Sequence, residues 1–111
     1  MAFQTAINRT IRQPGLHRSS ARTLPVGLSR VTVRLDSDWP DTADVALLGI
    51  EFSPDDGTTW LHRVSAAIYG GRRNSLGDVP SITMRQPPPG LYRLFILLST
   101  AVDLGIEIQV E

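Results

Sequence analysis

The sequence predicts an all-β fold: a single antiparallel β-sandwich of jelly-roll or immunoglobulin-like type. Three observations support this prediction. Apolar and polar residues alternate along short segments, as they do on strands that bury one face. Gly, Pro, Asp and Asn clusters separate these segments at close intervals. The chain has 111 residues, which is enough for one domain with a sizeable core.

Six strands are expected. Strict alternation in the first and last of them indicates one buried face, whereas the segments at 45–52 and 91–98 are apolar on both faces and are expected to be central strands. Turn residues at 38–41, 70–71, 76–78 and 87–90 separate the strands. The six segments are 31–35, 45–52, 60–69, 81–85, 91–98 and 104–110.

The run Pro89-Gly90-Leu91-Tyr92-Arg93 resembles the corner before a late strand in immunoglobulin-like sandwiches. In those domains a tyrosine hydroxyl bonds back to the backbone a few residues upstream. Tyr92 is therefore expected to be an analogue of the tyrosine corner.

Residues 1–28 are predicted to form an extended basic N-terminal arm, and residues 29–111 the sandwich domain. Apolar residues in the arm are too sparse to build a core, and Pro14-Gly15 and Leu24-Pro25 interrupt it. The spacing of its apolar residues fits one face of a helix and one face of a strand equally well. If it is a separate arm, deletion of residues 1–24 leaves a folded sandwich. The alternative is that it adds an edge strand to its own sandwich. The sparse apolar residues are Phe3, Ile7, Ile11 and Leu16, and the spacing that fits a helix or a strand is that of the first three.

The charges are divided between the two parts of the chain. Six arginines and no acidic residue precede Asp36, whereas five arginines and eleven acidic residues follow from Asp36 on, so the formal charges are +6 and −6. Every basic residue is arginine, whose planar guanidinium suits paired contacts with carboxylates at interfaces. The arm is therefore predicted to bind a neighbouring subunit, including the acidic body of the next copy. Its binding residues are predicted to be Arg9, Arg12, Arg18 and Arg22 together with Phe3, Ile7 and Ile11.

Residues 53–60 contain the most specific motif of the chain, Ser53-x-Asp55-x-Gly57-x-Thr59-Trp60. It resembles the Asp box, the repeat of bacterial neuraminidases, which forms a hairpin at propeller corners away from the catalytic centre. A propeller needs at least about four four-stranded blades, so this chain is too short to be one. The motif is interpreted as a structural turn in which Asp55 and the hydroxyl groups bond the backbone and Gly57 takes a positive φ. Asp55 and Asp56 lack the further oxygen ligands of a calcium loop.

Catalytic chemistry is not predicted. The chain has no cysteine, and no serine lies in a nucleophile-elbow pattern. His62 is expected on the same side of its strand as Trp60 and Val64 and is interpreted as a structural histidine. No catalytic residue, metal or cofactor is expected, and the longest apolar run, 94–98, is too short to cross a membrane. The remaining titratable candidates are His17 and the acidic loop of Asp36, Asp38, Asp41 and Asp44.

Three noncatalytic functions are considered. The first is a structural subunit of a large assembly, most specifically a bacteriophage virion protein of the decoration, cement or tail-associated kind, with a homo-oligomer expected and the virion as its location. The second is a carbohydrate-binding module that uses Trp39, Trp60 or Tyr69. The third, nucleic-acid binding through the arm arginines, is disfavoured because Phe3 is the only aromatic residue there.

Overall fold

The computed structural model describes residues 3–36, 46–68 and 81–111, and within these ranges the chain forms nine strands and no helix. All strand pairs are antiparallel. The strands are β1 (Gln4–Arg12), β2 (Gly15–Arg18), β3 (Arg22–Leu24), β4 (Arg30–Leu35), β5 (Ala46–Ser53), β6 (Leu61–Ile68), β7 (Ser81–Arg85), β8 (Gly90–Leu98) and β9 (Val102–Val110).

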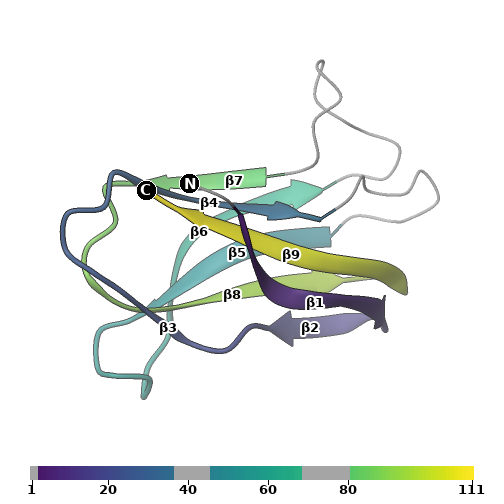
Figure 1. The fold of residues 1–111 in the computed structure, drawn as a ribbon. Helices are drawn as coiled ribbons and strands as arrows, with labels where there is room; N and C mark the ends of the chain where they lie inside the picture. The colour runs from purple at the N-terminus through teal and green to yellow at the C-terminus, as the bar shows by residue number, and fades with distance from the viewer. Residues whose placement is uncertain (1–2, 37–45, 69–80) are drawn as a thin grey trace.

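The strands form two sheets that pack face to face (Figure 1). The first sheet has the order β1-β9-β4-β7, and the second has the order β2-β8-β5-β6, with β3 pairing β8 beyond the end of β2. The prediction of an all-β antiparallel sandwich is confirmed. All six predicted strands are present, and β5 and β8 are central, as their apolar character indicated. The turns expected at 38–41, 70–71 and 76–78 lie outside the described residues.

The N-terminal segment is part of the sandwich. β1 pairs with β9 at one edge of the first sheet, and β2 and β3 pair with β8 at the edge of the second. This pairing differs from the predicted separation of an arm, residues 1–28, from a domain, residues 29–111. It agrees with the alternative, in which the segment adds edge strands to its own sandwich. The chain crosses from the first sheet to the second at Pro14-Gly15, between β1 and β2.

The apolar residues of this segment do not share one face. Register shifts in β1 fall between Thr5 and Ile7 and between Ile7 and Thr10, and each such bulge changes the side on which the following residues lie. As a result, Ile7 is buried in the core, Ile11 is 68% exposed, and the ring of Phe3 lies 3.6 Å from the guanidinium carbon of Arg34.

The core lies between the sheets and is built from the alternating positions of both. Val33, Ile96 and Ile106 are fully buried, and Leu35, Leu48, Ile50 and Leu104 are nearly so. In the first sheet, Ile106 of β9 is paired with Ile7 on one side and Leu35 on the other. Within the described residues, no helix is long and apolar enough to span a membrane.

Tyr92 has the geometry expected of a tyrosine corner. Its side chain is buried, and its hydroxyl donates a 2.7 Å hydrogen bond to the carbonyl oxygen of Pro88, four residues upstream. Its ring packs on Phe52 with a centroid distance of 5.0 Å. Burial raises the pKa of the Tyr92 hydroxyl, and the charge of Arg63 opposes this effect. The bond ties the turn before β8 to the core.

Candidate functional site

The turn after β5 is closed by its own side chains. The Ser53 hydroxyl donates to Asp55 Oδ1 at 3.0 Å and accepts from the Gly57 N–H at 2.6 Å, and the Thr59 N–H donates to Asp55 Oδ1 at 2.6 Å. Gly57 has a φ of 97°, as predicted, and Asp56 also has a positive φ of 59°. These bonds are those of a self-satisfied turn, in which Asp55 accepts from a backbone N–H four residues ahead.

Acid is expected to weaken this turn through Asp55. Hydrogen bonds from the Thr59 side chain and backbone lower the pKa of Asp55 below its ordinary value of 3.8, with a smaller contribution from Ser53. Because the folded-state pKa is lowered, the stabilisation is present above the unfolded-state pKa and is lost as pH falls from about 3.8 through the folded value.

Urea midpoints measured from pH 6 to pH 2.5 test this. Asp55→Asn should remove part of the loss of stability in acid, and Asp56→Asn, next to it in the same turn, should not. Equal pH profiles for the wild type and Asp55→Asn would contradict the assignment.

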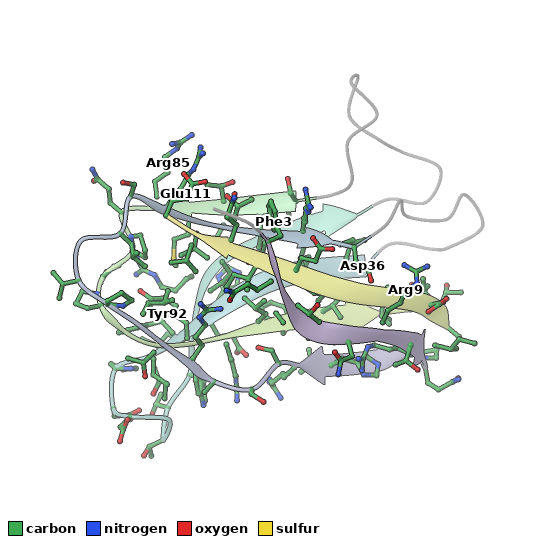
Figure 2. All side chains as sticks on the ribbon, viewed as in Figure 1. Phe3, Arg9, Asp36, Arg85, Tyr92 and Glu111 are labelled. Atoms are coloured by element: carbon green, nitrogen blue, oxygen red, sulfur yellow. The ribbon has the colours of Figure 1, made fainter. Side chains whose placement is uncertain are left out.

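The N-terminal arginines are used mostly within the chain. Arg9 forms an ion pair with Asp36 at 2.9 Å and approaches Asp103 at 3.5 Å, and Figure 2 shows Arg9 and Asp36 close together at one end of the sandwich. Arg18 pairs with Glu51. Further into the chain, Arg30 forms two hydrogen bonds with Glu111, and Arg34 pairs with Glu107. Many of the arginines that give the N-terminal part its charge of +6 therefore pair with acidic residues of the same chain. A neighbouring copy is not needed to neutralise them.

The other two predicted arm arginines, Arg12 and Arg22, have different surroundings. Arg12 donates from Nη2 to the carbonyl oxygen of Asn8 at 2.7 Å, and its buried Nε has no hydrogen-bond partner. Arg22, on β3, is exposed at the edge of the second sheet. The seven residues predicted to bind a partner are therefore distributed over the core, both sheet edges and the surface, and they do not form one patch.

A row of apolar side chains crosses the outer face of the second sheet. Leu16 on β2 is paired with Leu97 on β8, Leu97 with Leu47 on β5, and Leu47 with Ala67 on β6. Leu16 and Leu97 are each 46% exposed. The neighbouring residues Ile96 and Leu98 on β8 are buried on the inner face, so the leucines are on the outer face by strand alternation. Four strands thus contribute to one apolar row.

Phe95, two residues before Leu97 on β8, lies next to this row on the outer face and is buried there. A Cβ added at Gly49, its partner on β5, would overlap the ring of Phe95. The ring therefore lies close over the glycine backbone, and Phe95 is only 8% exposed although it is on the outer face. We call Leu16, Leu47, Ala67, Phe95 and Leu97 the leucine face.

Charged groups border the leucine face along the sheet. Glu51 Oε1 accepts a hydrogen bond from Arg93 Nε at 2.8 Å and from Arg18 Nε at 3.2 Å. The guanidinium carbon of Arg93 lies 4.0 Å from the centre of the Trp60 ring. Two arginines share one carboxylate, so the border carries excess positive charge.

The outer face of the first sheet is polar by comparison. Strand alternation places Arg30, Thr32 and Arg34 of β4 on this face, opposite the inward Val31, Val33 and Leu35. The paired positions on β7 and β9 are also polar: Ser81, Thr83, Arg85, Glu107 and Gln109. The two outer faces of the sandwich therefore differ in kind.

Other candidate groups do not form a site in the described residues. His62 Nε2 lies 2.8 Å from the Ser65 hydroxyl, and His17 Nε2 lies 2.7 Å from the Gln13 carbonyl oxygen. In the described ranges, no group of three or more His, Cys, Asp or Glu side chains is placed to hold a metal ion. Asp36 accepts from the Gly105 N–H at 3.0 Å besides pairing with Arg9. The other members of the predicted acidic loop, Asp38, Asp41 and Asp44, lie outside the described residues.

The aromatic residues assigned to carbohydrate binding are not seen as one platform. Trp39 and Tyr69 lie outside the described residues. Trp60 is half-buried, and the guanidinium of Arg93 occupies one face of its ring. That face is therefore not free to stack on a sugar.

Comparison with models of known protein families finds no match, and comparison with curated proteins finds no significant similarity. The resemblance to the Asp box therefore rests on residues 53–60 alone. The leucine face was not predicted as a site, although its signal was in the sequence. The segments at 45–52 and 91–98 are apolar on both faces, and such segments imply cover on both sides.

Proposed function

We propose that this chain is a non-enzymatic structural subunit of a larger assembly, a bacteriophage virion protein of the decoration, cement or tail-associated kind, and that the leucine face docks on a neighbouring subunit. The neighbours include other copies of the same chain. The observation that carries the proposal is the apolar row that runs in register from Leu16 to Ala67 on an outer sheet face.

Exposure of this row has a cost that a partner removes. Contiguous apolar patches on the outside of a small domain mark interaction sites, and the cores of protein interfaces are apolar with a polar border. The leucine face has both parts, since Leu97 on the central strand β8 and Leu16 on the edge strand β2 are each half-exposed, and the Arg18–Glu51–Arg93 group lies at its border.

The border also indicates the charge of the partner. Two arginines hold one carboxylate, and Arg93 is fixed on both sides by Glu51 and Trp60. A partner surface with apolar residues flanked by carboxylates would complement this arrangement. The assignment to a virion in particular rests on the small size of the chain and its sandwich fold.

The proposal is tested by a charge placed in the leucine face. Leu97→Glu is expected to reduce incorporation of the chain into particles at least about tenfold, because burial of a carboxylate at the centre of an interface costs more than about 1.4 kcal/mol. Incorporation is measured by quantitative mass spectrometry of gradient-purified particles from cells that produce the chain as wild type or variant.

Thr32→Glu is the matched control, since it places the same charge on a central strand in the outer face of the first sheet. It should be incorporated like the wild type, and both variants should give wild-type circular dichroism spectra. Full incorporation of Leu97→Glu would overturn the docking role of the face, and absence of the wild-type chain from purified particles would overturn the virion assignment.

A further inference from the structure

A cleft enters the sandwich at the edge formed by β1 and β3. It has a volume of about 200 Å³ and reaches core side chains of both sheets. In the described part of the chain, β1 pairs only with β9 and β2 and β3 pair only with β8, so no strand pairing joins the two sheets at this edge. The floor of the cleft is formed by Val31, Ile50, Met84, Tyr92, Leu94 and Ile108.

Ser19 is bonded to β8 at the point where the edge strand is interrupted between β2 and β3. Its N–H donates to the Leu94 carbonyl oxygen at 2.9 Å, and its hydroxyl accepts from the Leu94 N–H at 2.8 Å. One residue thus satisfies both backbone groups of Leu94. Residues 19–21 form the mouth of the cleft with small side chains, Ser19, Ser20 and Ala21.

An arginine stands at this mouth on the inner side of the sheet. Arg22 is paired with Tyr92, and Leu24 with Gly90. Tyr92 and Leu24 are both buried between the sheets, so strand alternation places Arg22 on the same inner side. Arg22 lines the cleft and is exposed. Among the described residues, the structure gives Arg22 no ion-pair partner.

We propose that this cleft binds a small amphiphile with an aliphatic chain and an anionic head, of the class of medium-chain carboxylates. An apolar cavity of about 150 Å³ is large enough to bind benzene, so a cleft of about 200 Å³ has room for a chain of about six carbons. The chain lies against Ile50, Leu94 and Ile108, and the carboxylate lies at the mouth, where Arg22 and the hydroxyl of Ser20 can contact it. This site is separate from the leucine face and does not depend on the proposed function.

The test is a titration of the full chain with hexanoate and with 1-hexanol, followed by methyl NMR. Both are expected to shift the methyl signals of Val31, Ile50, Leu94 and Ile108 saturably, with hexanoate binding more tightly. Arg22→Gln should weaken hexanoate binding roughly two- to fivefold, the range of an exposed ion pair, and leave hexanol binding unchanged. Arg85→Gln, an exposed arginine outside the cleft, should change neither.

A second variant tests the cleft independently of charge. Ala6→Leu adds side-chain volume to the lining and should weaken both ligands alike. Absence of saturable shifts at these methyl groups with either ligand would overturn the site. Equal affinities for hexanoate and hexanol, with no effect of Arg22→Gln, would overturn the anionic head.

Discussion

Deletion of residues 1–24 is expected to leave a chain that does not fold. The deletion removes β1, which covers the edge of β9, and β2 and β3, which cover the edge of β8. The backbone of β9 and of β8 is therefore exposed along these edges. It also removes Ile7 and Leu24 from the core, and both are less than 8% exposed. Losing two core side chains costs roughly 2–5 kcal/mol each, which is comparable with the whole stability of about 5–15 kcal/mol of a small domain.

Whether the truncated chain folds is measured by thermal unfolding followed by circular dichroism and by the chemical-shift dispersion of its proton–nitrogen NMR spectrum. The matched control keeps the strands and removes the charge: a chain with Arg9, Arg12, Arg18 and Arg22 each replaced by glutamine should fold and melt cooperatively. A truncated chain that melts cooperatively at the wild-type temperature would show that the segment is a dispensable arm.

The second large effect is expected at Ile106. This side chain is fully buried between Ile7 and Leu35 at paired positions of the first sheet. Ile106→Ala should lower the free energy of unfolding by about 2–5 kcal/mol, because it removes buried methyl groups and leaves a cavity.

Ile11→Ala is the control, since it makes the same change on the neighbouring strand β1, where the side chain is 68% exposed. Its effect should stay within about 0.5 kcal/mol. Urea denaturation of both variants gives the comparison. Equal destabilisation by the two substitutions would contradict the placement of the core and the register of β1.

The strands of the sandwich were predictable because their signals are local. Alternation such as that of Val31, Val33 and Leu35 reports burial on one face without knowledge of the partner strand. β1 to β3 were not predictable in the same way. Their edge positions tolerate polar residues, and the bulges in β1 disturb the period that would have identified it.

The candidate site divides along the same line. The turn at residues 53–60 is closed by contacts within four residues, so its hydrogen bonds follow from the motif. The leucine face combines Leu16, Leu47 and Leu97, which are brought together only by strand order and register. Likewise, the sequence separates the arginines from the acidic residues, and only the pairing of β1 with β9 brings Arg9 to Asp36 and Asp103.

Hydroxyl-radical footprinting of the isolated chain and of the assembled particle tests the central claim, that the leucine face is covered by a neighbour. Labelling at Leu16 and Leu97, each 46% exposed in the isolated chain, should fall severalfold on assembly. Val26, which is 80% exposed and lies outside the sheets, is the internal reference and should be labelled equally in both states. Unchanged labelling of both leucines in particles that contain the chain would contradict the account.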